Sequence, residues 1–269
     1  MLRKRIIFTL IYSNGFFMLS RNFRLQKVGN LKWLETNYKF QKTSFSIDEL
    51  IVLNATKENK SIEDFASTVN NLVHNVFIPI AAGGGIRRIE DAELLFSSGA
   101  DKIVLNTILS DKPEIVTELV SKYGSQSIVA CIDYKKNGKY NEVFIKDGTK
   151  KIKRTLEEYL KYVIGLNVGE IYLNSIDQDG TGFGYDIQTI KKLQSKIPIP
   201  LIIAGGAGNE SHLEEGITEE GVNAVATANL FNFVGNGLPN ARISILKNGE
   251  NIANWNDRDK FLNSFKRSD

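Results

Sequence analysis

The sequence predicts a single eight-stranded (β/α)8 barrel, and three observations support this fold class. The chain has 269 residues, which is a usual length for such a barrel and long for other single domains. Short apolar runs alternate along the chain with amphipathic, helix-like stretches. The first half of the chain also resembles the second half at an offset of about 121 residues. An open, doubly wound sheet is the weaker alternative, because it would need fewer strands and no closure.

Eight apolar runs are the predicted strands. They are nearly continuous in apolar residues, as are parallel strands covered on both faces, and they span 6–11, 50–53, 77–82, 102–105, 127–132, 170–173, 200–204 and 224–228. Helical patterns lie between them. Residues 62–73 follow Ser61, which predicts an N-cap because Asp64 stands three residues later. Asp111 and Pro113 indicate a similar helix start before residues 115–119.

The internal repeat is four strand–helix units used twice. Segments of the first half match segments of the second, namely 6–11 with 128–133, 49–54 with 170–175, 78–85 with 199–206 and 99–106 with 221–228. We therefore expect half-barrels of about 1–124 and 125–246 within one domain spanning 1–250. Residues 251–269 lack strand signals and read as a polar C-terminal tail.

Composition excludes several classes of protein. A hydrophobic content of 42% can fill a large core, and 24% charged residues with a net charge of only +3 argue against disorder and nucleic-acid binding. No apolar stretch is long enough to span a bilayer, and we interpret the basic start of the chain as leading into a strand rather than a signal peptide. The single cysteine, Cys131, fits the core of a cytoplasmic protein. With His74 and His212 as the only histidines, we expect no metal and no cofactor.

Glycines follow the third and seventh predicted strands, where a barrel carries its chemistry. Such glycines let backbone amides approach an anion closely, although they also permit tight turns. Because the two glycine runs are related by the repeat, we favour two phosphate sites and a ligand with a phosphate at each end. The predicted binding residues are Gly84, Gly85, Asn106 and Thr107 in the first half, and Asp179, Gly180, Gly205, Gly206, Ala228 and Asn229 in the second.

Asp133 ends the fifth predicted strand and is the candidate general acid or base. The repeat places Ile11 at the equivalent position, so chemistry with two carboxylates across the mouth is not available. Alternatively, Asp133 is an ion-pair partner of Lys135 or Lys136. The aromatic and apolar stretch at 12–19 predicts a ligand seat, a partner surface or a packed lid.

Four charged residues stand at strand starts and therefore at the opposite end of the barrel. They are Arg5, Glu49, Lys102 and Glu170. Because unpaired charges there would be costly, we expect two acids and two bases to pair. Such a cluster is either a plug that closes the core or a gate that opens to a small neutral molecule.

With these residues in view, the chain resembles the HisF family, the cyclase subunits of imidazole glycerol phosphate synthase, from Met1 to about Phe233. The resemblance rests on KRII at 4–7, GGGI at 83–86, GADK at 99–102, YGSQ at 123–126, ID at 132–133, SIDQDGT at 175–181 and GYD at 184–186. It implies a two-half barrel and a bis-phosphorylated ribulosyl aminoimidazole carboxamide substrate. It also implies ammonia from a glutaminase subunit docked on the N-terminal face near Asp101. The ammonia would pass a gate formed by the four charged residues.

Three positions depart from the family pattern. The first catalytic aspartate of the family falls on Ile11, its loop lysine on Leu19 and its second-strand aspartate on Asn54. Loss of a general acid or base costs about 10²- to 10⁴-fold in rate. At Ile11 and in its apolar loop the chain is similar to a HisF-like branch of surface-glycan pathways, which implies ammonia delivery for acetamidino-sugar synthesis with a sugar amidotransferase partner. Two alternatives stay open: a histidine-pathway cyclase, and a non-catalytic scaffold that binds a phosphorylated ligand.

Overall fold

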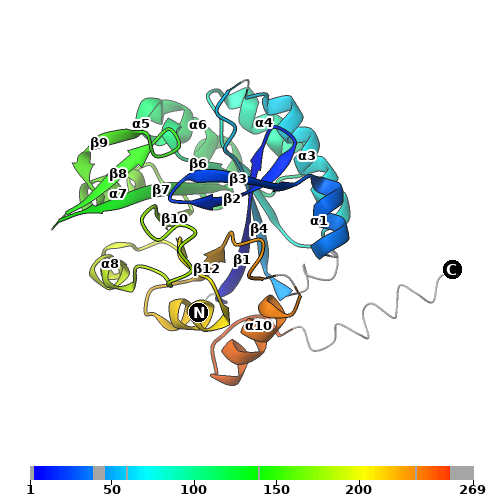
Figure 1. The fold of residues 1–269 in the computed structure, drawn as a ribbon. Coiled ribbons are helices and arrows are strands. Elements are labelled where there is room, and N and C mark those ends of the chain that lie inside the picture. Colours follow the sequence, from blue (N-terminus) through cyan, green and yellow to red (C-terminus); the bar gives the residue numbers. More distant parts are fainter. Residues whose placement is uncertain (1–2, 39–45, 59, 139, 234, 255–269) are drawn as a thin grey trace.

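The computed structural model describes residues 3–38, 46–58, 60–138, 140–233 and 235–254, and within them eight parallel strands close into a barrel (Figure 1). The strands pair in the order β1–β4–β5–β6–β7–β10–β11–β12, and β12 returns to β1. This confirms the predicted fold class. The strands are β1 (Arg5–Ser13), β4 (Glu49–Asn54), β5 (Ile80–Gly83), β6 (Lys102–Leu105), β7 (Ile128–Asn137), β10 (Glu170–Ser175), β11 (Leu201–Ala204) and β12 (Ala224–Thr227).

Helices surround the barrel and cover the outer faces of the strands (Figure 1). They are α1 (Leu31–Tyr38), α3 (Ile62–Asn75), α4 (Ile89–Ser97), α5 (Thr107–Asp111), α6 (Pro113–Tyr123), α7 (Leu156–Ile164), α8 (Ile187–Leu193), α9 (Glu210–Thr218) and α10 (Gly237–Lys247), with 3-10 turns η2 (Ser125–Ser127) and η3 (Gln194–Lys196). The cap predicted for α3 is present, because the Ser61 hydroxyl accepts the backbone N–H of Asp64 at 3.0 Å.

Two predicted boundaries need correction. The strand expected from residue 77 begins at Ile80, and the side chain of Phe77 is 82% exposed, because only its apolar character and not its burial could be read from the sequence. Asp111 does not begin a helix: it ends α5, and Lys112 is the N-cap residue of α6 with Pro113 in its first turn.

Each half-barrel carries a β-hairpin after its first strand, a feature that the apolar runs did not predict. In the first half β2 (Phe16–Arg21) pairs antiparallel with the end of β1 and with β3 (Arg24–Gly29). In the second half β8 (Tyr140–Ile145) pairs in the same way with β7 and with β9 (Lys150–Thr155). The structural repeat therefore extends beyond the strands to the hairpins, which project from the same end of the barrel (Figure 1).

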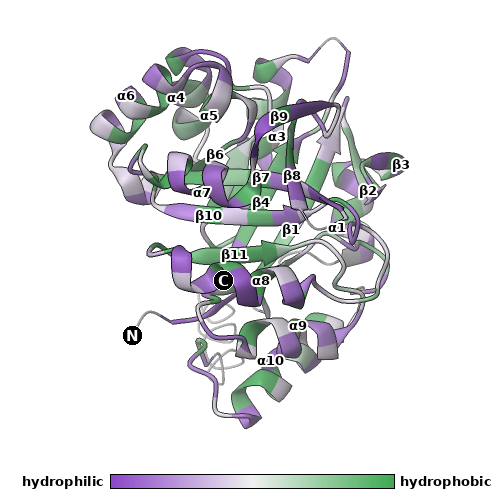
Figure 2. Cartoon of the chain, turned by 90° about the vertical axis from the view of Figure 1, so that its left-hand side faces the viewer, coloured by the Kyte–Doolittle hydropathy of each residue, from purple (hydrophilic) through white to green (hydrophobic). Residues whose placement is uncertain are grey.

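The core has two parts. One lies between the strands and the helices, whose inner faces carry the apolar residues (Figure 2). The other fills the barrel interior with Ile7, Ile51, Ala81, Val104, Val129, Cys131, Tyr172, Ile202, Ala204, Ala224 and Ala226. Four of these eleven side chains are alanines, so small residues fill part of the interior.

The chain after α10 still contacts the barrel. Ile252 is buried and forms a parallel bridge with Lys4, and the Arg242 guanidinium donates to the carbonyl of Ala253 at 2.6 Å. Most of the predicted tail, 255–269, lies outside the described residues, and the division at residue 250 stays a prediction. No helix in the described ranges has the length and apolar character needed to cross a membrane.

Candidate active site

One cavity of about 780 Å³ opens at the carboxyl ends of the strands. It is lined by every residue predicted to catalyse or to bind phosphate, namely Gly84, Gly85, Asn106, Thr107, Asp133, Asp179, Gly180, Gly205, Gly206, Ala228 and Asn229. Ile11 lines it as well, as the repeat predicts. The fold thus brings the two halves of the predicted site together, while the chemical role of each residue is a separate question.

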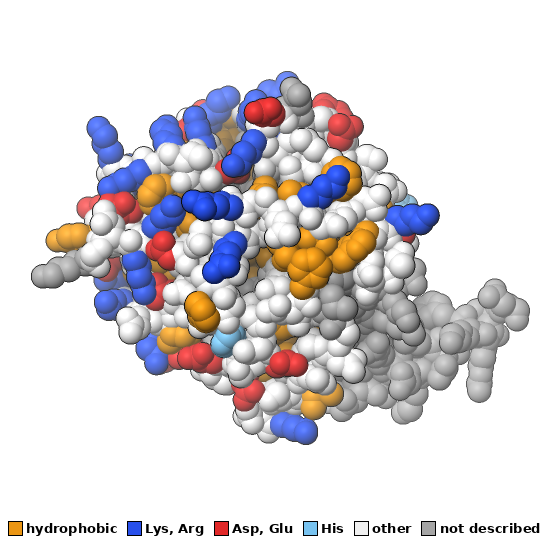
Figure 3. Space-filling model, viewed as in Figure 1, with side chains coloured by type: hydrophobic (Ala, Val, Ile, Leu, Met, Phe, Trp, Pro, Cys, Tyr) orange, Lys and Arg blue, Asp and Glu red, His pale blue; other side chains and the backbone are white. Residues whose placement is uncertain are grey.

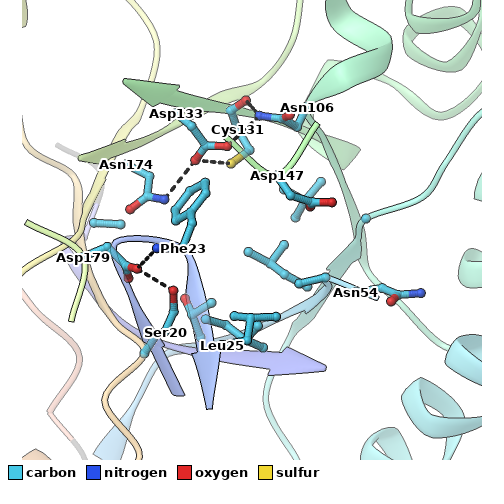
Figure 4. Close-up of a pocket in the computed structure, with 18 of the residues that line it drawn as sticks. Ser20, Phe23, Leu25, Asn54, Asn106, Cys131, Asp133, Asp147, Asn174 and Asp179 are labelled. Atoms are coloured by element: carbon cyan, nitrogen blue, oxygen red, sulfur yellow. Dashed lines mark hydrogen bonds between the residues drawn. The ribbon is translucent and has the colours of Figure 1, made fainter. Parts of the chain in front are cut away.

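Asp133 lies at the bottom of this cavity and is held by two amides. The side-chain Nδ2 of Asn106 donates to its Oδ2 at 3.0 Å, and Nδ2 of Asn174 donates to its Oδ1 at 2.9 Å (Figure 4). The thiol of Cys131 lies 3.8 Å from Oδ1. Neither Lys135 nor Lys136 pairs with Asp133: the ammonium of Lys135 lies over Phe144, and Lys136 pairs with Asp186 at 2.7 Å.

The surroundings of Asp133 favour its neutral form. Burial raises the pKa of Asp133 to about 7; the amide of Asn174 opposes this rise, and the charges of Asp179 and Asp147 add to it. A carboxyl group with this pKa holds its proton half of the time near neutral pH. It can therefore donate or accept a proton, as general acid–base catalysis requires.

The other positions where the family would place charged groups are apolar or point elsewhere. Ile11 and Leu19 line the cavity with aliphatic side chains. The amide of Asn54 points away from the cavity (Figure 4), and its Oδ1 accepts the N–H of Thr56 at 3.1 Å. Asp133 is thus the acid at the end of the first strand of its half, with no counterpart in the other half.

Asp179 fastens the β2–β3 hairpin across the mouth. Its Oδ2 accepts the Ser20 hydroxyl at 2.5 Å and the N–H of Phe23 at 3.0 Å, and its carbonyl accepts the N–H of Asn22 at 2.9 Å. The side chain of Asn22 also donates to the carbonyls of Ile176 and Asp177. Of the interpretations of the stretch 12–19, the packed lid describes the structure best, because Tyr12 and Phe17 are buried in the core.

Phe23 occupies the tip of this hairpin in a strained conformation. Its φ of +63° and the +50° of Asn22 form a two-residue turn that favours asparagine and glycine. The ring projects into the cavity toward Asp133 and Cys131 (Figure 4). Asp179 thus holds a bulky residue in a left-handed conformation, which is the kind of strain found at functional sites.

The rim glycines are required by the protein's own packing. A Cβ on Gly84 would lie 2.3 Å from the carbonyl oxygen of Asn54, and one on Gly206 would lie 1.9 Å from that of Gly184. The side chain of Asn229 is also used internally, since its Oδ1 accepts the N–H groups of Phe231 and Asn232. These contacts fit the tight-turn alternative, so binding of phosphate at either rim is a proposal.

At the opposite end of the barrel the four predicted charges form a closed ring. Arg5 pairs with Glu49 at 2.5 Å and with Glu170 at 3.0 Å, and Lys102 pairs with each of the same two carboxylates at 3.0 Å. Burial raises the pKa of Glu49 even though Arg5 and Lys102 oppose that rise. The expected pairing of two acids with two bases is confirmed.

The same strands carry the ring at one end and the partners of Asp133 at the other. Lys102 begins β6 and Asn106 directly follows its last residue, and Glu170 and Asn174 are likewise four residues apart on β10, a distance of about 13 Å. Between them, inside the barrel, the hydroxyl of Tyr172 hydrogen-bonds to that of Thr9 at 3.1 Å. The packed interior between the ring and the cavity is therefore short and includes a polar pair.

Asp101, predicted to lie near a partner contact, is exposed beside the ring residue Lys102. Its carboxylate accepts the N–H of Ile80 at 2.8 Å and so orders the start of β5. The described residues contain no group of three or more His, Cys, Asp or Glu side chains able to hold a metal ion.

Ser20, Phe23, Lys60 and Asn174 are among the cavity side chains that the sequence analysis did not anticipate. Asn174 follows the sixth predicted strand, and its place at the end of a barrel strand was a usable signal. The others lie on segments outside the eight predicted strands, and nothing local in the sequence indicates that they turn toward the mouth.

Comparisons with known proteins agree with this architecture. The model of a family described as "Histidine biosynthesis protein" matches residues 26–235. A relative from Parasynechococcus marenigrum, provisionally named imidazole glycerol phosphate synthase subunit hisF2, is 43% identical over 256 residues, which are 95% of each chain. The imidazole glycerol phosphate synthase subunit HisF of Pyrobaculum aerophilum is 41% identical over 69% of this chain and 73% of its own length. A Leptospira borgpetersenii relative with a provisional HisF name is 40% identical over 70% and 75%. The closed barrel, the repeated rim and these matches together place the chain in the HisF family of histidine biosynthesis proteins.

Proposed function

We propose that the chain is a HisF-like synthase subunit that receives ammonia from a glutaminase partner and serves acetamidino-sugar synthesis. The observation that carries this proposal is Ile11, which lines the cavity at the position equivalent to Asp133. An aliphatic side chain cannot transfer a proton, so the cavity holds one acid where a two-carboxylate cyclase holds two. Ammonia delivery does not need the second acid. It needs an entrance at the N-terminal end of the barrel, a route through the interior and an opening at the carboxyl end.

The proposed route for ammonia runs from the N-terminal end of the barrel to the cavity at the carboxyl end. Ammonia released by a glutaminase docked at the N-terminal face, near Asp101, would reach the ring of Arg5, Glu49, Lys102 and Glu170. Arg5 and Lys102 are long side chains whose ion pairs can re-form after they move, so a small neutral molecule could pass. Asp133, with a pKa of about 7, would then accept or donate the proton that separates ammonia from ammonium.

Further partners lie at the mouth. A phosphorylated ligand would bind there, and a sugar amidotransferase that converts an acetamido into an acetamidino group would use the delivered ammonia. Asp133 would offer such a ligand its carboxyl group, and Asn174 the second N–H of its amide. The amide of Asn106 is already used by Asp133 and by the carbonyl of Cys131.

The second candidate is a cyclase of the histidine pathway. It is favoured by the names of the relatives and by the neutral pKa of Asp133, which suits a single residue that acts as both acid and base. Asp133 alone would then have to replace the pair, at a cost of about 10²- to 10⁴-fold in rate.

Rescue of a histidine auxotroph that lacks its own HisF subunit separates the two candidates. The wild-type chain, co-expressed with the glutaminase of that host, should fail to restore growth, while the host subunit restores it as the positive control. Growth supported by the wild-type chain would overturn the proposal in favour of the cyclase. An Ile11→Asp variant tests whether the missing carboxylate is the cause, since gain of growth in that variant alone supports the argument.

A further inference from the structure

Charges of both signs line the cavity, and burial separates them. Among the described lining residues, the charged side chains that are buried are both acids, Asp133 and Asp179. The basic side chains are exposed or half-buried and lie around the mouth; they are Arg21, Arg24, Lys57, Lys60, Arg87, Lys112 and Lys146. Figure 3 shows Lys and Arg side chains crowded at the surface near β3, β8 and β9. The buried charge of the cavity is therefore acidic, while its exposed charge is mostly basic.

Asp133 has no ion pair with a lysine or arginine among the described residues. The two charges that raise its pKa, those of Asp179 and Asp147, are both negative. A buried carboxylate without a countercharge is costly. The bottom of the cavity therefore favours a ligand that brings a positive charge to this carboxylate.

The two oxygens of Asp133 can each accept a donor from such a ligand. Oδ2 accepts one N–H from Asn106 and Oδ1 accepts one from Asn174, and a carboxylate oxygen has room for two hydrogen bonds. The other neighbour of Oδ1 is the thiol of Cys131 at 3.8 Å, which is a weak donor that an N–H group can displace. The carboxylate thus offers a pair of acceptor positions side by side.

The β2–β3 hairpin places an aromatic ring opposite this carboxyl group. Phe23 projects into the cavity toward Asp133 (Figure 4), and its backbone N–H is held by Asp179 at 3.0 Å. An aromatic ring attracts a cation as well as apolar groups. The aliphatic side chains of Ile11 and Leu19 line the same cavity. A cation that fits here therefore needs N–H donors on one side and an apolar part on the other.

From these contacts we propose that the cavity binds an amidinium group, with its two N–H donors on the oxygens of Asp133 and its carbon substituent against Phe23. An amidinium is planar and cationic, and its paired N–H groups match a carboxylate as the fork of arginine does. The neutral acetamido group has a similar outline but carries no charge. The inference rests on the proposed function and deepens it, because it assigns the acetamidino group a binding site in this cavity.

Ligand-observed NMR titration of the full chain with acetamidinium tests this site, with acetamide and methylammonium as comparison compounds. Acetamide keeps the shape without the charge, and methylammonium keeps the charge and a methyl group with a single nitrogen. We expect saturable binding of acetamidinium at about pH 8. Acetamide and methylammonium should each bind at least about 10-fold more weakly, because each lacks a charge-assisted hydrogen bond.

The affinity for acetamidinium should also depend on pH. Only ionised Asp133 pairs with the cation, so the affinity should fall roughly 10-fold between about pH 8 and pH 6. Four other titratable groups act on Asp133 or lie beside it in the cavity: Cys131, Tyr172, Asp147 and Asp179. Burial raises the pKa of Cys131 and of Tyr172 well above this range, so both stay neutral.

Three variants locate the binding. Asp133→Asn should weaken acetamidinium binding about 10- to 100-fold and remove its pH dependence, since the amide carries no charge. Phe23→Leu should weaken it about 2- to 30-fold, the range of a cation–π contact. Asp111→Asn removes a carboxylate from the exposed end of α5 at the edge of the same cavity. It is the matched control and should bind like wild type.

The inference is overturned if acetamidinium does not bind, if either comparison compound binds as tightly, or if Asp133→Asn and wild type have equal affinity at about pH 8. The three compounds are compared on the wild-type chain, so this part of the test holds even where a variant is unstable. Thermal unfolding checks the fold of each variant.

The titration uses neither ammonia nor a partner, so its outcome is separate from that of the histidine rescue. Failure to bind acetamidinium would remove the amidinium site and leave ammonia delivery to be judged by the rescue. Growth in the rescue would remove the role in sugar synthesis and leave the measured binding site.

Discussion

Ile11 and Asp133 occupy equivalent positions on the first strands of the two half-barrels, and both line the same cavity. One position keeps a buried acid held by two amides, and the other is aliphatic. The two half-barrels therefore share their backbone arrangement, but only the second half carries an acid at this position.

Replacement of Asp133 by Asn should change how the free energy of unfolding depends on pH. Burial raises the pKa of Asp133 from 3.8 to about 7, so the folded chain keeps a proton that the unfolded chain releases near pH 4. The associated stabilisation is complete below the unfolded pKa and is lost as the pH rises through 7. A shift of about three pKa units corresponds to about 4 kcal/mol.

Urea unfolding of both chains between about pH 4 and pH 8.5 measures this effect. The wild type should lose stability relative to Asp133→Asn by up to ~4 kcal/mol across that range. A difference between the two chains that does not change with pH would contradict the assigned pKa. For function, full ammonia-dependent activity in Asp133→Asn would favour the non-catalytic scaffold.

Removal of the Ser20 hydroxyl should loosen the β2–β3 hairpin without unfolding the barrel. Ser20→Ala deletes one of the two hydrogen bonds to Asp179 Oδ2, and a hydrogen bond to a charged group contributes about 1.5 to 3 kcal/mol. Hydrogen exchange at the Phe23 amide should therefore be roughly 10- to 100-fold faster. Ser211→Ala, which removes a hydroxyl from the exposed start of α9, is the control. Unchanged protection of Phe23 would show that Asp179 does not fasten the hairpin.

Glu49→Gln should destabilise the chain more than Glu170→Gln. Both carboxylates contact Arg5 and Lys102, but the side chain of Glu49 is 2% exposed and that of Glu170 12%. Loss of the more buried charge leaves two cations with one carboxylate, at a cost of about 3 to 5 kcal/mol. Urea denaturation gives the values, and Glu93→Gln, in an exposed pair with Lys122, should cost less than about 1 kcal/mol. An equal loss of stability in all three variants would mean that burial of the ring does not raise the cost of removing one of its charges.

The single thiol should react slowly in the folded chain. Burial raises the pKa of Cys131 well above its ordinary value, and the negative charge of Asp133 adds to that rise. A thiol reagent at neutral pH should label the native chain far more slowly than the chain in urea. Since the protein has one cysteine, mass spectrometry reads the result directly, and rapid native labelling would contradict the buried position.

The sequence determined the barrel, its duplication and the positions of the candidate acid and the charged ring. Continuous apolar runs, rim glycines and charges at strand starts are local patterns, and their periodicity fixes which end of the barrel each residue occupies. Ile11 could be paired with Asp133 in this way because both lie on repeated strands. Asn174 belongs to the same class of strand-end residues.

Tertiary structure alone decided which groups meet across the mouth. The bond from Ser20 to Asp179 joins residues 159 positions apart, and it depends on a hairpin in which only the first strand is apolar, while β3 has no apolar run. Likewise the environment that brings the pKa of Asp133 to about 7, and the placement of Lys60 over Gly85, arise from packing between loops. Such contacts depend on burial and distance in space, which no periodicity along the chain encodes.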